Sequence, residues 1–142
     1  MIYGAEDIFR DFLQGKDLKF THERITVLRE ISRLKRHFDI EELYITLRKK
    51  DRKVSRASVY RTVPLLVESG LVEEIKTIDT HTYYEYTFGK EHHDHLICLK
   101  CGKIIEFHSE KLEHIQDEVC RKEDFSGVRH VLEIQGYCKK CG

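Results

Sequence analysis

The sequence has no apolar run that approaches the about 20 residues needed to span a membrane. Its first eleven residues, MIYGAEDIFRD, carry charge early and lack the apolar stretch of a signal peptide. We therefore predict a cytoplasmic protein without membrane contact. Asparagine is absent and methionine occurs once, while lysine and glutamate are abundant, a composition that leans toward a thermophilic source.

The chain also has no net charge, because its 25 basic residues balance its 25 acidic ones. The two halves differ, however. Residues 1–70 carry 15 Lys and Arg against 11 Asp and Glu, whereas residues 71–142 carry 10 against 14. This asymmetry favours a front half that faces nucleic acid and a back half that binds cations. The length suffices for one ordinary domain or two small ones.

Apolar residues recur at helical spacing through most of residues 1–70, which predicts four helices. The first covers residues 5–14, and the others begin after the N-caps Thr21, Asp39 and Ser55. Glu42 completes a capping box with Asp39, Gly70 ends the fourth helix, and Pro64 is expected to bend it. The predicted core residues are Ile8, Phe9, Phe12, Leu13, Ile25, Leu28, Ile31, Leu34, Ile40, Leu43, Tyr44, Leu47, Val59, Val63, Leu66 and Val67.

Two β-rich segments, LVEEIKTI (71–78) and TYYEYTF (82–88), follow and predict a hairpin. Four helices and a hairpin form the pattern of a winged helix-turn-helix with one extra helix in front. The fourth helix leaves Arg56, Tyr60 and Arg61 off its core stripe, where they are suited to contact DNA bases and phosphates. The pattern alone is equally compatible with a solvated basic face, and Lys19 by itself indicates a solvated lysine.

Residues 91–107, EHHDHLICLKCGKIIEF, concentrate three histidines, three carboxylates and a Cys-x-x-Cys pair in a predicted strand–turn–strand. Side chains alternate between the two faces of a strand. His93 and His95 therefore share one face if this segment is extended, and His92 and Asp94 share the other. Each pair offers two ligands to a different metal ion, and the remaining ligands must come from elsewhere in the fold.

The Cys98–Cys101 pair is matched by Cys138 and Cys141 at the other end of the back half. Two such pairs in a reducing compartment predict a four-thiolate structural Zn²⁺ site, with redox-active dithiols as the alternative. A helix (109–121) and a strand (128–137) are predicted between the pairs. Cys120 has no partner at this spacing and is interpreted as a structural cysteine, with a free surface thiol as the alternative.

His130 alternates with Val128, Leu132 and Ile134 on the apolar face of the predicted strand 128–137. Such a histidine is often a hydrogen-bonded core residue. The incomplete pair formed by His92 and Asp94 favours its interpretation as a metal ligand.

The segments SRASVYRTVPLLVESGLV, YEY and HHDHLICLKCGKIIEF together resemble the ferric uptake regulator family, and the resemblance extends over nearly the whole chain. It implies an α+β protein with an N-terminal winged-helix DNA-binding domain (1–88) and a small α/β metal-binding dimerisation domain (89–142). It further implies a homodimeric, metal-activated transcriptional repressor that binds palindromic double-stranded operator DNA and controls metal-uptake genes.

The resemblance also implies the role of each candidate residue. The regulatory metal site falls on His37, Glu85, His93, His95 and Glu106, and a second metal site on His92, Asp94, Glu113 and His130. The structural zinc falls on Cys98, Cys101, Cys138 and Cys141, and the family's DNA contacts fall on Lys19, Tyr60 and Arg61, beside the Arg56 inferred above. Fe²⁺ is the expected regulatory ion, with Mn²⁺, Co²⁺ or Zn²⁺ able to substitute.

Other functions stay open from the sequence. Peroxide-sensing members of the family use Asp where this chain has Glu106, and manganese- or zinc-sensing members are further alternatives. A zinc-stabilised protein-interaction module is another interpretation, and a metallohydrolase built on the His/Asp cluster is a remote one. No nucleophile motif is visible, so we predict a protein that is not an enzyme and has no small-molecule substrate.

Overall fold

The computed structural model describes residues 3–51, 53–77 and 81–142. The chain divides into two compact units, Met1–Lys90 and Glu91–Gly142, and each is described by itself. Within the described ranges, no helix is both long and apolar enough to cross a membrane.

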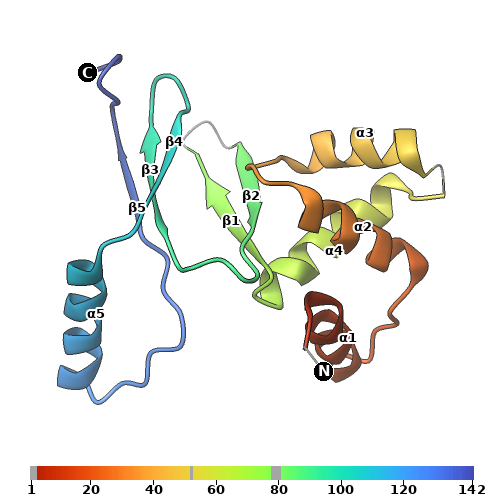
Figure 1. The fold of residues 1–142 in the computed structure, drawn as a ribbon, viewed down its shortest axis with the longest axis horizontal. Helices are drawn as coiled ribbons and strands as arrows, with labels where there is room; N and C mark the ends of the chain where they lie inside the picture. The colour runs from red at the N-terminus through yellow and green to blue at the C-terminus, as the bar shows by residue number, and fades with distance from the viewer. Residues whose placement is uncertain (1–2, 52, 78–80) are drawn as a thin grey trace. The chain divides into compact units, whose positions relative to one another are not determined.

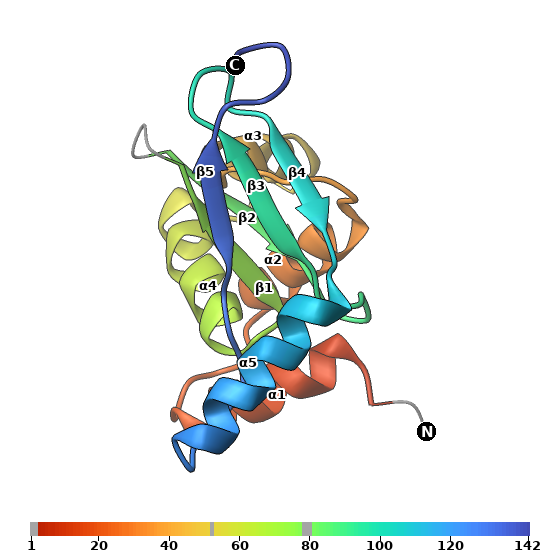
Figure 2. The same ribbon diagram turned by 90° about the vertical axis from the view of Figure 1, so that its left-hand side faces the viewer.

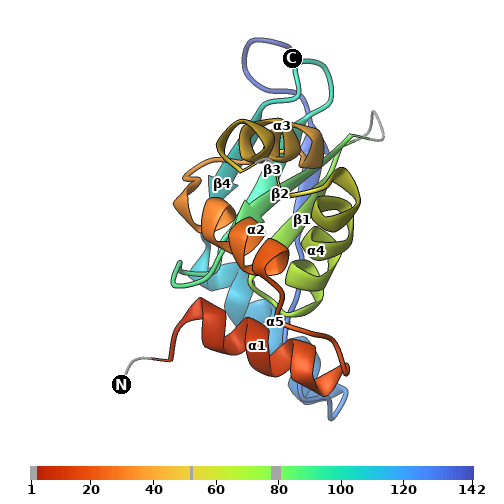
Figure 3. The same ribbon diagram turned by 90° about the vertical axis from the view of Figure 1, so that its right-hand side faces the viewer.

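Four helices open the first unit: α1 (Ala5–Gly15), α2 (His22–Arg33), α3 (Ile40–Lys50) and α4 (Arg56–Glu68) (Figures 1 and 3). Their starts confirm the predicted caps. Thr21 accepts from the Arg24 N–H, Ser55 accepts from the Ser58 N–H, and the capping box at the start of α3 is complete. Pro64 lies inside α4, which continues to Glu68.

The four helices enclose one hydrophobic cluster that includes most of the predicted core. On α2, Leu28 and Ile31 are buried and Leu34 packs against the cluster as predicted, whereas Ile25 is only half-buried and Val27, which was not predicted, is fully buried. Glu30 is also buried, and Lys50 donates to its carboxylate over 2.8 Å. This ion pair to another helix allows a charged side chain to turn inward, which helical periodicity does not reveal.

A hairpin follows α4 and consists of β1 (Val72–Lys76) and β2 (Thr82–Tyr86), paired antiparallel. The prediction that the first strand includes Ile78 lies outside the described residues. Phe38 extends the pairing, because its N–H donates to the Tyr84 carbonyl over 3.0 Å and its carbonyl accepts from the Tyr84 N–H over 2.7 Å. This bridge fixes the segment before α3 against β2.

The second unit has a three-stranded sheet in the order β4-β3-β5, with a helix connecting β4 to β5 (Figure 2). β3 (Asp94–Cys98) pairs antiparallel with β4 (Ile104–Phe107) and parallel with β5 (Glu133–Gly136). The helix α5 (Glu110–Lys122) begins at the N-cap Ser109 and buries none of its residues. Together the two units form a mixed α+β fold, which confirms the predicted class.

The last predicted strand was too long. Only Glu133–Gly136 forms a strand, and Val128, expected on an apolar face, is 98% exposed. β5 pairs with the four residues from His95 to Cys98 of β3, and ahead of Glu133 the pairing extends only to the Leu132 carbonyl, which accepts from the His95 N–H over 3.3 Å. An apolar alternation alone does not supply the hydrogen bonds that define a strand.

Candidate metal centres and nucleic-acid interface

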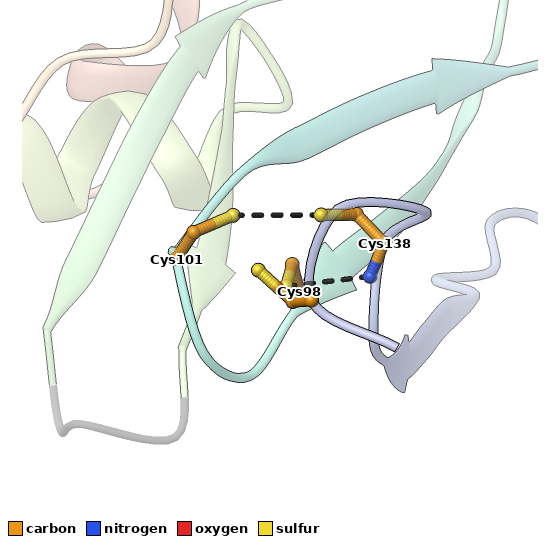
Figure 4. Close-up of side chains that lie close together, drawn as sticks. Cys98, Cys101 and Cys138 are labelled. Atoms are coloured by element: carbon orange, nitrogen blue, oxygen red, sulfur yellow. Dashed lines mark hydrogen bonds between the residues drawn. The ribbon is translucent and has the colours of Figure 1, made fainter.

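All four paired cysteines meet at one end of the second unit's sheet. Cys98 ends β3 and Cys138 follows β5, and the parallel register places Cys98 opposite Gly136. The Leu99 N–H donates to the Gly136 carbonyl over 2.8 Å, which joins the two turns. The four sulfur atoms all lie within 4.8 Å of one another, and none is in a disulfide. Figure 4 shows three of these cysteines, Cys98, Cys101 and Cys138, side by side. Sequence spacing predicted this assembly, but the pairing of β3 with β5 produces it.

Each cysteine pair is held in a tight backbone turn. In the first, the Gly102 N–H donates to the Cys98 carbonyl over 3.0 Å, and Gly102 has φ of 76°, a conformation that glycine adopts without strain. In the second, the Cys141 N–H donates to the Cys138 carbonyl over 2.9 Å. These turns direct both sulfur atoms of a pair to the same point.

The turns also stabilise thiolates, which are the form that binds zinc. Hydrogen bonds from the backbone N–H groups of Cys101 and Cys138 lower the pKa of Cys98 to about 6. Cys141 behaves oppositely, because its thiol hydrogen-bonds to Cys138 and its pKa rises to about 12. Four negative sulfurs repel one another, so full ionisation requires a cation among them. The donor set therefore fits Zn²⁺.

A second cluster in the same unit joins two imidazoles and two carboxylates. His92, Asp94, Glu113 and His130 each offer a ligand atom, and these atoms lie within 4.8 Å of one another. His92 Nε2 lies 2.8 Å from His130 Nε2 and 3.2 Å from Asp94 Oδ1, and His130 Nε2 lies 3.4 Å from Glu113 Oε1. β3, α5 and the extended chain before β5 each contribute to it.

Asp94 gives this cluster its chemical character. Its side chain is 1% exposed, and its Oδ2 has no hydrogen-bond partner among the described residues. Burying a carboxylate is costly unless the charge is paired or coordinates a metal. The two imidazoles beside it suit a divalent transition ion, so the residues fit a metal here. His108 steadies the site from outside, because its Nδ1 lies 2.9 Å from the His92 carbonyl oxygen.

His93, just before β3, and His95 on β3 lie side by side, as alternation predicted. Their ring centroids are 5.1 Å apart. Glu106 of β4 is the cross-strand partner of His95, and its carboxylate lies 3.6 Å from His93 Nε2. The second unit thus brings three of the five predicted regulatory ligands to one place.

The other two predicted regulatory ligands meet in the first unit. The bridge between Phe38 and Tyr84 sets their neighbours, His37 and Glu85, beside each other, with 3.4 Å between His37 Nε2 and Glu85 Oε2. The Glu85 side chain is 2% exposed, and Lys90 Nζ lies 3.4 Å from its other oxygen. This pair is therefore a partly neutralised buried carboxylate next to an imidazole.

Sequence reasoning missed Glu73 at this position. Glu73 is the cross-strand partner of Glu85, and their carboxylates approach within 4.8 Å. Like charges directly opposite each other destabilise a sheet unless a cation lies nearby. The register of the hairpin would have revealed the pair, but the register is not visible in the sequence alone.

The predicted DNA-contacting residues are all exposed on the first unit. Arg56 and Tyr60 lie on the first turns of α4, and each contacts the carboxylate of Glu41 on α3. Lys19 precedes α2, and Arg61 follows Tyr60 on α4. The contacts of Glu41 were not predicted, because no local spacing links it to α4.

Comparison with known proteins identifies relatives along nearly the whole chain. The model of the ferric uptake regulator family matches residues 15–135. A ferric uptake regulation protein of Rhizobium leguminosarum bv. viciae is 39% identical over 121 residues, which cover 85% of this chain and 84% of that protein.

Solved structures agree with this result. The ferric uptake regulator of Helicobacter pylori, whose structure reveals three functional metal binding sites, superposes with a TM-score of 0.75 and 32% identity over 99% of this chain and 96% of that one. The ferric uptake regulator of Pseudomonas aeruginosa with manganese gives a TM-score of 0.78 and 27% identity over 92% and 97%.

Proposed function

This chain belongs to the ferric uptake regulator family, and from that premise we propose that it is an Fe²⁺-responsive repressor that binds palindromic operator DNA as a homodimer. Its targets are metal-uptake genes. One observation carries the proposal: neighbouring residues at the start of β3 and just before it divide between two separate ligand sets, His92 with Asp94 and His93 with His95. A protein that only needed zinc for stability would not require either set.

The regulatory ion is bound by ligands from both units. His37 and Glu85 supply two donors from the first unit, and His93, His95 and Glu106 supply three from the second. Neither group alone meets the coordination needs of Fe²⁺ or Mn²⁺, and together they form a mixed imidazole–carboxylate set that suits these ions. An ion held by both groups ties the units in one relative orientation.

This connection explains how metal activates DNA binding. A ligand shifts a conformational equilibrium only by its different affinities for the two states. Without the ion, the two winged helices of a dimer vary in spacing. With it, they hold the separation of two half-sites in a palindrome, which strengthens binding by about 1–3 kcal/mol per effector event.

Exposed apolar residues of the second unit support homodimerisation. β5 is an edge strand, and Ile134 on it is 49% exposed. Further exposed apolar side chains lie on α5 and before and after β5: Ile115, Val119, Phe125, Val128, Val131 and Tyr137. Large apolar side chains exposed in this number on one small unit are typical of a subunit interface.

Each of the remaining sites has its own role in the proposal. The cysteine cluster holds structural Zn²⁺, and the cluster around Asp94 is a second metal site. The proposed DNA contacts are Lys19, Arg56, Tyr60 and Arg61. A protein that binds operator DNA works in the compartment that holds the DNA, so we propose a cytoplasmic location. Membership in a family of transcription regulators argues against the metallohydrolase. A manganese, zinc or peroxide sensor of the same family is the second candidate function, since the ligand types accept several ions.

Operator binding measured against each ion tests the proposal. A duplex is first selected from a random pool by the Mn²⁺-loaded protein, and its affinity is then measured at fixed salt with Fe²⁺ (without oxygen), Mn²⁺, Co²⁺ and Zn²⁺. We expect a palindromic sequence to be enriched and Fe²⁺ to activate at the lowest concentration. Activation by another ion at lower concentration would favour the second candidate, and binding that ignores all four ions would contradict a regulatory metal.

A further inference from the structure

Glu41 lies between the two exposed side chains that begin the DNA-facing surface of α4. Its Oε2 accepts a hydrogen bond from the Tyr60 hydroxyl over 2.9 Å and forms an ion pair with the Arg56 guanidinium. Arg56 also lies over the ring of Tyr44, with 4.4 Å to the ring centroid. Two residues of α3 therefore hold Arg56 in place, and one of them also holds Tyr60.

This arrangement is not needed to build the fold. The side chains of Glu41 and Arg56 are 43% and 56% exposed, and exposed ion pairs contribute little to stability. The N-terminus of α4 is already occupied, because the Glu23 carboxylate accepts from the Ser55 N–H over 3.2 Å and contacts the Ser58 hydroxyl. The contacts of Glu41 thus add nothing to the capping of the helix.

The charge of Glu41 opposes DNA. The ion pair with Arg56, aided by the Tyr60 hydroxyl, holds the pKa of Glu41 below its ordinary value, so its carboxylate stays ionised at neutral pH. A DNA phosphate offers the same kind of acceptor to an arginine and a tyrosine as this carboxylate does. Phosphate and Glu41 therefore compete for the same two side chains.

We propose that Glu41 weakens DNA binding by withholding Arg56 and Tyr60 from phosphates in the free protein. On random DNA, displacing the carboxylate gains only a phosphate contact, which does not outweigh the contacts of Glu41. On an operator, base contacts along α4 supply the additional free energy that releases both side chains, so the cost of displacing Glu41 lowers operator affinity too. Glu41 is thus a positioning residue that holds back the DNA interface, an inference that rests on the proposed DNA-binding function.

Replacement of the carboxylate by its neutral isostere, Glu41→Gln, tests this role. Affinity for a random-sequence duplex and for the selected duplex is measured across a series of salt concentrations. One additional phosphate contact changes the slope of log affinity against log salt by about −0.9, which corresponds to about eightfold at 0.1 M salt relative to 1 M. We expect about this gain on the random duplex and a gain at least as large on the selected duplex, because the wild-type protein must break the Glu41 contacts to bind it.

Glu6→Gln is the matched control. Glu6 and Arg29 form an ion pair on the same unit, with side chains 38% and 57% exposed, and its loss changes net charge equally. An equal gain in Glu6→Gln and Glu41→Gln would reduce the effect to overall charge and overturn the proposal. An unchanged salt slope in Glu41→Gln would overturn it as well.

The partner residue supplies a second check. In an Arg56→Gln background, Glu41→Gln should lose most of its effect, because the withheld cation is gone. A full effect in that background would contradict the role of Arg56.

Failure of the proposed function would be visible separately. The wild-type protein would then enrich no sequence, whereas the comparison of variants on the random duplex would still give a result. Absence of all DNA binding at low salt would refute both.

Discussion

The two units of this protein differ in what holds them together. The first contains a cluster of buried apolar residues from α1–α4 and the hairpin. In the second, the buried apolar residues among those described are Ile97 and Cys98, and α5 buries none. Its 52 residues instead carry all eight side chains of two ligand clusters and the larger part of the proposed regulatory set, whose other members lie in the first unit.

Small domains that lack a sufficient core depend on metals or on association. Under the proposed function, the two units therefore have different tasks. The first unit is stable through packing and presents the proposed DNA contacts. The second would depend on ions and on a partner subunit, so that its conformation responds to metal supply. A sensor benefits from having these two properties in different units.

Cys98→Ser should have the largest effect, because it should unfold the second unit and leave the first one folded. Structural zinc contributes apparent binding free energy on the order of 10 kcal/mol, which is folding free energy for a small domain. We expect loss of zinc and rapid proteolysis within residues 91–142, while the first unit still unfolds cooperatively. Cys120→Ser is the control, because Cys120 is outside the cluster. A folded, dimeric, zinc-free Cys98→Ser protein would contradict the assignment.

Leu28→Ala tests whether the first unit is stabilised by its apolar cluster and not by metal. Leu28 is 1% exposed within the apolar cluster, and such a truncation costs about 2–5 kcal/mol. Urea unfolding should show this loss in the first unit, with zinc content unchanged. Ile45→Ala, at a residue 47% exposed on α3, should change stability little. Loss of zinc on Leu28→Ala would show that the units are not independent.

His130→Ala should remove the second metal site alone. A ligand present at 100 times its dissociation constant stabilises the form that binds it by about 2.7 kcal/mol. The variant should lose this gain in thermal stability on adding metal, and should bind one ion fewer per chain by atomic absorption. His114→Ala, on an exposed residue of α5, should behave as wild type. An unchanged ion count in His130→Ala would contradict the site.

His93→Ala and His95→Ala test whether the regulatory ion links the two units. Both units should stay folded in these variants, but metal should no longer affect DNA binding. We expect zinc content to persist and metal-dependent operator binding to disappear, a loss of about 1–3 kcal/mol of coupling. Anisotropy titrations with and without Mn²⁺ measure it, with His114→Ala as the control. A preserved metal response in both variants would refute the regulatory site.

Lys19→Ala should have the smallest effect. As a phosphate contact, it should weaken binding about equally on all duplexes and reduce the salt slope by about 1. Arg61→Ala should instead weaken operator binding more than random binding. The same loss on both duplexes for Arg61→Ala would make Arg61 a phosphate contact too.

Much of the local structure was predictable from the sequence. The side chains of Thr21, Asp39 and Ser55 accept hydrogen bonds from the N–H groups three residues further along the chain. Such caps can therefore be recognised from a short stretch of sequence. The division between His92 with Asp94 and His93 with His95 follows from strand alternation. The long strand predicted over residues 128–137 failed because strand formation depends on a distant partner, and β3 pairs only with its second half.

The sequence by itself determined which side chains have the chemistry of metal ligands and how neighbouring residues divide between faces, because both depend on residue type and short spacing. Only the tertiary structure decided which distant groups meet: Glu41 with Arg56, Glu73 with Glu85, and Lys50 with Glu30. Such contacts arise from strand register and helix packing over separations of 12 to 20 residues or so. No local sequence pattern predicts these contacts, because the residues between the two partners do not by themselves determine how close the partners lie.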